Sequence, residues 1–210
     1  MRISKEKAAE NRAALIRAAS KLFRERGIDG VGVAEISKEA GLTHGALYAH
    51  FKSKEELALE ALAYGFEQNN ARMYASTING MPDLATFVDR YLEPECLVDY
   101  GSRCPMAASA SEIGRQDKAI STRFAEGYLV TARAFERQIA DSHPGSDALG
   151  RGMVAVATLI GSVAVARGAA KSNPALAEQV LKAARRMVDE LMLAAPPADP
   201  APLAVEVKAG

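Results

Sequence analysis

Apolar residues recur every three or four positions along most of the chain, which is the spacing of one face of an α-helix. The first such stretch carries a stripe of five apolar residues, Leu15, Ala18, Ala19, Leu22 and Phe23. It ends before Gly27, a residue suited to the left-handed conformation that closes many helices. Strand-like alternation is nearly absent. The pattern therefore predicts an all-α protein whose first helix stops at Gly27.

Two short helices are expected after the first one. Residues 33–40 form one of them, Gly41 breaks it, and residues 43–50 form the next. Leu47 and Phe51 are four positions apart and therefore face the core together. Two short helices joined by a glycine turn and packed on a longer helix make a helix-turn-helix.

Small polar residues mark the starts of the next helices. Thr43 stands where it caps the second short helix. Ser53, followed by Glu56, forms a capping box, which predicts the start of a fourth helix. Lys54 lies in the first turn of that helix, where free backbone amides favour a phosphate.

The outward face of residues 43–50 suits the major groove of DNA. Gly45 and Ala46 are small enough for close approach, and hydroxyl and imidazole groups can reach bases or phosphates. Two of the candidate residues also have a purely structural interpretation. Tyr48 could be an aromatic residue that packs on the head, and Lys54 could be a solvated surface charge.

Charge is unevenly distributed although the chain is neutral overall, with 26 basic and 26 acidic residues. Residues 1–54 hold eleven basic and six acidic side chains, and residues 55–210 hold fifteen and twenty. A basic segment attached to an acidic body indicates that only the first part faces nucleic acid, unless the clustering is chance.

The stretch GVGVAEISKEAGLTHGALYAHFKSKEEL resembles the DNA-binding domain of the tetracycline-repressor (TetR) family of bacterial transcription regulators. The resemblance implies that Thr43, His44, Ala46 and Tyr48 face the operator, beside Gly45, and that His50 and Lys54 contact phosphates. One departure concerns Gly32, where the family has a capping serine or threonine. The phosphate contact that the serine or threonine makes in the family is then either lost in this chain or made through the backbone amide of Gly32.

The body beyond residue 60 carries apolar and aromatic helices that suit a small-molecule pocket. A helix should start at Asp83 and end or bend at Pro94. Pro105 fits the first position of another helix, which places Cys104 at its N-cap, where the helix dipole favours a thiolate. The expected pocket residues are Phe87, Tyr91, Cys104, Phe124 and Tyr128.

The last two helices need burial on two sides. The stretch LGRGMVAVATLIGSVAVARGA is apolar nearly all round, and PALAEQVLKAARRMVDELMLAA is apolar on two adjoining faces. The same helices of a second subunit would cover the remaining face in a four-helix bundle, and the TetR resemblance implies the same homodimer. The expected interface residues are Val156, Ile160, Val163, Val180, Ala184, Met187 and Leu191.

These observations predict three regions: a DNA-binding head (1–56), an effector-binding and dimerisation body (57–195), and a flexible tail (196–210). The chain starts without a signal peptide, and its most apolar run is shorter than a membrane span, so a cytoplasmic protein is expected. No phosphate loop, metal spacing or nucleophile motif is present in the sequence, so we expect neither an enzyme nor a cofactor or metal.

The leading hypothesis is a repressor released from double-stranded operator DNA by a small-molecule effector. Two alternatives stay open at this point. Cys104, beside Arg103, could sense electrophiles or oxidants, or it could be a small buried residue at a helix start. The chain could also be an architectural DNA-binding protein that senses nothing, although the large apolar body is surplus to that role.

Overall fold

The computed structural model of the protein describes residues 4–142, 144 and 147–193, and within them the chain is almost entirely helical. The first helices are α1 (Lys5–Arg26), α2 (Val33–Glu39), α3 (His44–Tyr48) and α4 (Lys54–Met73). They are followed by β1 (Thr77–Ile78), β2 (Met81–Pro82), α5 (Leu84–Tyr91), the 3₁₀-helix η1 (Pro94–Leu97), α6 (Pro105–Ile113), α7 (Lys118–Ser142), α8 (Ala148–Ala170) and α9 (Pro174–Leu193). The all-α prediction is confirmed.

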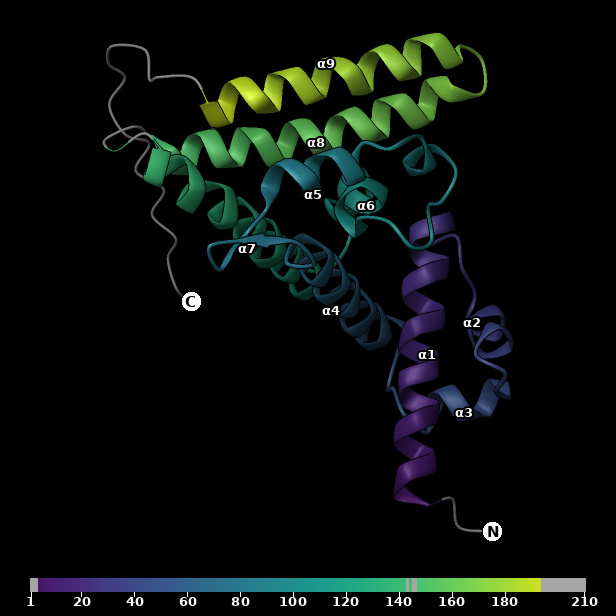
Figure 1. The fold of residues 1–210 in the computed structure, drawn as a ribbon. Helices are drawn as coiled ribbons and strands as arrows, with labels where there is room; N and C mark the ends of the chain where they lie inside the picture. Colours follow the sequence, from purple (N-terminus) through teal and green to yellow (C-terminus); the bar gives the residue numbers. More distant parts are fainter. Residues whose placement is uncertain (1–3, 143, 145–146, 194–210) are drawn as a thin grey trace.

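The helices form a head and a body (Figure 1). The head consists of α1, α2 and α3, and α4 runs from the head along the body. In the body, α8 and α9 lie antiparallel along one another at the end farthest from α3. The surface of α3 and the surface of the α8–α9 pair therefore lie at opposite ends of the molecule.

Local capping explains where the helices of the head begin and end. Gly27 ends α1, as its sequence position predicts, and its φ is positive at 79°, but its ψ of 160° lies outside the left-handed helical conformation expected there. The Ser53 hydroxyl accepts the Glu56 amide at 3.2 Å and starts α4. The other half of the predicted capping box differs, because the Glu56 carboxylate accepts the amide of Lys52, at 2.6 Å, instead of that of Ser53.

Two local features differ from the sequence prediction. Thr43 occupies the N-cap position of α3, but its side chain makes no capping hydrogen bond. In addition, residues 77–82 form a hairpin, β1 paired with β2, that the helical periodicity does not predict. Asn79 and Gly80 form its turn with φ values of 52° and 78°, a conformation that this dipeptide adopts readily.

Each part of the fold has its own hydrophobic core. The head core joins α1, α2, α3 and the first half of α4, and it extends through Leu62, beyond the expected boundary at residue 56. Ile113 and Ile120 also belong to it, so the end of α6 and the start of α7 pack on the head. The body core is built from α5 to α9. The expected tail, 196–210, lies outside the described residues.

Helix α8 is the central helix of the body. It is long and apolar enough to cross a membrane by length and composition alone. Its inner face, however, forms part of the body core, as in the core helix of a soluble protein. It lies so close to α7 that a Cβ atom at Gly152 would be 2.6 Å from the Ala132 carbonyl oxygen.

We predict that Gly152→Ala destabilises the protein by about 1–3 kcal/mol, because the added methyl group meets backbone atoms of α7 that cannot move aside alone. Thermal unfolding measures the effect. Gly114→Ala is the matched control, since Gly114 has a helical φ of −62° and its Cβ would meet no atom within 4 Å. Equal melting temperatures for the two variants would contradict the close α7–α8 packing.

Candidate DNA-binding face and ligand cavity

The helix-turn-helix presents one face of α3 to solvent. Leu47 and Phe51 are fully buried in the head core and fix the inner side of this segment. Six of the seven residues expected to contact DNA lie on or beside α3. Thr43, His44, Gly45 and Tyr48 are exposed, whereas Ala46 and His50 are half-buried.

The aromatic residues of α3 stand in the open. Tyr48 is 55% exposed, and His44 packs against it edge-on with ring centroids 5.6 Å apart. This exposure does not suit a packing role for Tyr48. Because the Thr43 side chain makes no capping bond, its hydroxyl is not committed to α3. A Cβ added at Gly45 would meet no atom within 4 Å, so the surface there is open to a close neighbour.

The backbone amide of Gly32, at the start of α2, is the group through which a phosphate contact is one of the two expected alternatives. This amide donates to the Glu35 carboxylate at 3.0 Å, so this backbone group is already used within the protein. Arg26 pairs with the same carboxylate at 2.8 Å. The Gly32 amide and the Arg26 contact both lower the pKa of Glu35 and keep it ionised. A phosphate contact through the Gly32 amide would have to displace an anion.

Lys54, the seventh expected DNA contact, is the first residue of α4. Its side chain is half-buried, and the Ser53 cap fixes the start of its helix. The lysine therefore projects from a defined point next to the segment that ends α3.

A cavity of about 240 Å³ lies in the body. Four helices, a residue two positions beyond the end of α4, and residues before, within and after η1 supply its walls. The helices contribute Asn69 and Arg72 (α4), Phe87, Arg90 and Tyr91 (α5), Ala107 (α6), and Val163 and Arg167 (α8). The segments between helices contribute Ala75, Glu93, Cys96 (in η1), Arg103 and Cys104. The cavity is therefore lined by elements far apart in the sequence and is partly open to solvent.

The structure brings together three of the five expected pocket residues. Phe87, Tyr91 and Cys104 line the cavity, and the Phe87 and Tyr91 rings are 5.8 Å apart. Phe124 and Tyr128 do not line it. Phe124 packs against Phe66 with centroids 6.5 Å apart, and the Tyr128 hydroxyl donates to the Met153 carbonyl oxygen at 2.7 Å. Both residues belong to the packing between helices.

Both cysteines line the cavity, and both are buried. Cys104 is the N-cap of α6 and precedes Pro105, as the sequence predicts. It is 5% exposed, and Cys96 is 1% exposed. Burial raises the pKa of Cys96 and thus favours its neutral thiol. Among the described residues, no group of three or more His, Cys, Asp or Glu side chains is placed to hold a metal ion.

The arginines of the cavity are the residues that sequence reasoning missed. Arg167 marks the end of the apolar run in the sequence, yet in the structure it is 8% exposed and points inward. The one sequence signal for this inward position is that Arg167 follows the apolar Val163 by four residues, because residues four apart share a helix face. Arg72 and Arg90 carry no signal in their segments that distinguishes them from solvated charges.

The residues expected at a dimer interface divide into two groups. Val156, Ile160, Val163 and Ala184 are buried in the chain's own core and do not reach an outward face. Met187 is 48% exposed on α9, and Val180 and Leu191 are partly buried beside it. The difference arises because α8 is apolar on all sides, so periodicity does not distinguish its inner side from its outer side.

Residues 15–61 match the family model described as bacterial regulatory proteins, tetR family. The HTH-type transcriptional regulator Rv0196 of Mycobacterium tuberculosis is 28% identical over 74% of this chain and 84% of the relative. The HTH-type transcriptional regulator TtgR of Pseudomonas putida is 46% identical, but over only 27% of each chain.

Two solved structures agree with the whole fold. A TetR transcriptional regulator from Legionella pneumophila has a TM-score of 0.72 at 16% identity, covering 91% of this chain and 100% of the other. The reduced form of NemR from E. coli has a TM-score of 0.66 at 19% identity, covering 90% and 99%. The head therefore matches the DNA-binding domain of the bacterial tetR regulatory-protein family, and the whole chain has the fold of solved TetR-family regulators.

Proposed function

We propose that the protein is a homodimeric repressor, acting in the cytoplasm, that leaves its operator when a small molecule enters the body cavity. One observation carries this proposal: α6 touches both the cavity and the head. Its first residues, with Cys104 and Ala107, line the cavity. Its last turn carries Glu112, which holds the loop that follows α1.

The contact between α6 and the head is a set of hydrogen bonds. The Glu112 carboxylate accepts the Asp29 amide at 3.1 Å. Gln116, just beyond α6, donates to the Asp29 carboxylate at 3.2 Å. A ligand that shifts α6 would therefore also shift the loop between α1 and α2, which carries the helix-turn-helix.

A second contact joins the head to the start of α6. Arg24 of α1 donates from Nε to the Gly101 carbonyl oxygen at 2.7 Å, two residues before the cavity residue Arg103. Under the proposed function, ligand binding acts on the head through this contact before α6 and through Glu112 in its last turn. A coupling of about 1–3 kcal/mol is typical of such linkage, and operator DNA would weaken ligand binding by the same factor.

We predict that Glu112→Ala loosens the head from α6. Loss of one hydrogen bond, worth about 1 kcal/mol, should speed amide hydrogen exchange at Asp29 several-fold. The variant should also show a smaller ratio of operator dissociation constants with and without any compound that releases the wild type.

The control for that experiment is Glu126→Ala, which removes an exposed carboxylate of α7 that pairs only with Arg123 in the described residues. It should leave both measurements unchanged. Wild-type exchange at Asp29 and wild-type release in Glu112→Ala would rule out α6 as the link.

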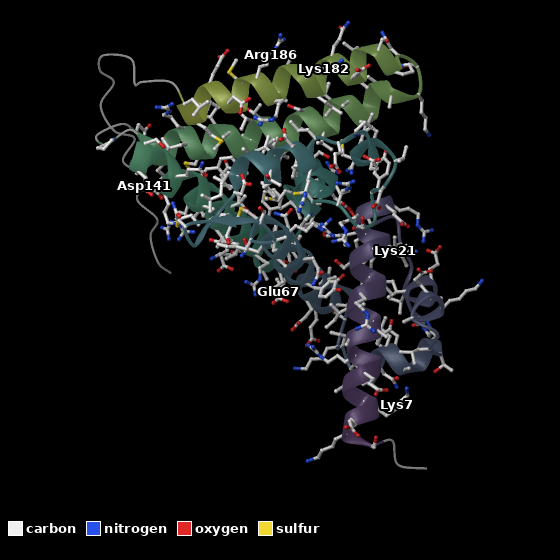
Figure 2. The ribbon with its side chains drawn as sticks, viewed as in Figure 1. Lys7, Lys21, Glu67, Asp141, Lys182 and Arg186 are labelled. Carbon is white, nitrogen blue, oxygen red and sulfur yellow. The ribbon has the colours of Figure 1, made fainter. Side chains whose placement is uncertain are left out.

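The DNA-binding role of the head yields a salt-dependence prediction. Lys54→Ala should weaken binding to all DNA sequences, because a phosphate contact carries no base information. The slope of log affinity against log salt should fall by about one unit per subunit. Lys182→Ala is the control, since Lys182 lies on α9, far from α3 (Figure 2). An unchanged slope in Lys54→Ala would remove this lysine from the interface.

The outer faces of α8 and α9 supply the proposed dimer interface. On α8 a stripe of small and apolar residues is exposed: Val154, Ala157, Gly161, Val165 and Gly168. On α9 a second stripe follows helical spacing: Leu176, Val180, Ala183, Met187 and Leu191. The charged side chains of Lys182 and Arg186 extend from another side of α9 (Figure 2). Small residues allow two helices to approach closely, so a four-helix bundle with a second subunit would bury both stripes.

Met187→Glu should shift the protein toward monomer and weaken operator binding. The reason is that an unpaired charge buried at an interface costs about 3–5 kcal/mol. Sedimentation at micromolar concentration measures the assembly. Ile78→Glu is the control, since Ile78 is 60% exposed on the hairpin, away from both stripes. A wild-type monomer, or a Met187→Glu dimer of wild-type affinity, would refute this interface.

The structure offers more support for this function than for the alternatives. An architectural protein needs no cavity connected to its head, whereas this body has one. The cysteine-sensing alternative requires a reactive thiolate; both thiols are buried on the cavity wall, and burial raises the pKa of Cys96 and favours its less reactive neutral form. We therefore assign the cysteines to the wall of a cavity for a non-covalent ligand.

A further inference from the structure

Arg167 places unsatisfied hydrogen-bond donors at the wall of the body cavity. Its Nε atom donates to the Cys96 carbonyl oxygen at 2.7 Å, and the guanidinium lies 4.2 Å from the centre of the Tyr100 ring. These two contacts fix the side chain in place. The Nη1 and Nη2 atoms are buried and have no hydrogen-bond partner. A buried cation with unmet donors is costly, so the site is incomplete without an acceptor.

The charges around Arg167 increase the demand for an anion. Arg72, Arg90 and Arg103 also line the cavity, and Glu93 is the one acidic residue among the lining residues. That carboxylate lies 3.8 Å from Arg103 and has no hydrogen bond to Arg167. Four arginines and one glutamate thus contribute to the lining, in a body whose sequence is acidic overall; Arg72 and Arg90 are also exposed to solvent, whereas Arg167 is buried.

Tyr91 adds a neutral donor to the same wall. Its hydroxyl oxygen is buried and has no nitrogen or oxygen partner in the described part of the chain. Its polar neighbour is the sulfur of Cys104, a weak acceptor. Burial, followed by the neighbouring Cys104, raises the pKa of Tyr91 well above its usual value, so the hydroxyl keeps its proton.

The rest of the lining is apolar except for the buried amide side chain of Asn69. Phe87, Ala107 and Val163 contribute carbon surface. At about 240 Å³, the cavity exceeds the ~150 Å³ void that takes benzene. The cavity therefore has room for an apolar body of at least one ring in addition to a charged group, whereas inorganic phosphate would leave the apolar wall uncovered.

We infer that the cavity binds an organic monocarboxylate with an aryl or alkyl body, whose carboxylate accepts from Nη1 and Nη2 of Arg167. Two parallel guanidinium N–H donors match the two oxygens of a carboxylate. The apolar body would lie against Phe87 and Val163. This inference rests on the proposed function, since it names the chemical class of the effector.

The test compares each acid with its own neutral amide on the wild-type protein. The probes are phenylacetate, phenylbutyrate and octanoate, each paired with its primary amide, with inorganic phosphate as a further probe. Isothermal titration should show the best acid binding at least about tenfold more tightly than its amide, the effect of one lost charge-assisted contact. Amides that bind as well as acids, phosphate that binds as well as acids, or a panel without any bound acid would overturn the inference.

Substitutions then locate the carboxylate. Arg167→Met keeps much of the side-chain bulk but removes the charge, and it should abolish the preference for acid over amide. Arg133→Met is the matched control, because Arg133 is exposed on α7 and does not line the cavity. A full acid preference in folded Arg167→Met would overturn the assignment. If Arg167→Met loses its helical circular dichroism, Arg167→Lys replaces it and should weaken acid binding by losing the two-pronged contact.

Operator release separates this inference from the proposed function. Acid binding that depends on Arg167 but leaves the operator complex intact would keep the ligand class and refute the effector role. Release by a neutral compound, with no acid bound, would keep the effector role and refute the anionic class. Release by the acid in wild type, but not in Arg167→Met, supports both.

Discussion

The half-buried guanidinium of Arg24 makes the contact on which the placement of the head depends. It extends from α1 into the junction where α4 and the start of α6 meet, and its Nε atom is held by the Gly101 carbonyl oxygen. Burial, the largest cause, lowers the pKa of Arg24, and nearby Arg72 lowers it further. The junction is possible because α4 has Gly65 there: a Cβ atom would be 3.0 Å from Arg24 Nη1 and 3.3 Å from Pro105. A small residue on one helix therefore sets how closely the head and body approach.

Helical periodicity predicts most of the fold but fails where a helix has more than one apolar side. The helices of the head follow from single stripes and from Gly27, Gly41 and Ser53, and they lie within a few residues of their predicted bounds. The hairpin was signalled by Asn79-Gly80, a local turn dipeptide that counts of helical spacing do not register. On α8 the sequence does not distinguish Val156, which is buried, from Val154, which is 52% exposed. That difference depends on where α7 and α9 pack.

The cavity shows a second reason why sequence reasoning is incomplete. Phe87, Tyr91 and Cys104 could be predicted because aromatic residues and a helix-start cysteine suggest a pocket on chemical grounds. Arg72, Arg90 and Arg167 come from three different helices, and each resembles a solvated charge within its own segment. Only tertiary packing brings them to one wall. A net charge that is zero over the chain therefore hides two local excesses, one in the head and one in the cavity.

Helix α8 connects the regions that a regulator of this kind must coordinate. One side of its last turns supplies Val163 and Arg167 to the cavity, and the opposite side exposes Val165 and Gly168 on the stripe proposed to meet a second subunit. The Arg167 guanidinium also holds η1 through the Cys96 carbonyl oxygen, and the chain then continues from η1 through Gly101 to α6. A carboxylate that occupied the free nitrogens of Arg167 would therefore act on a side chain fixed to the segment that leads to Arg24 and the head. Because α8 packs more extensively against α7 and α9 than against the segment from η1 to α6, we expect that segment to be the part that shifts.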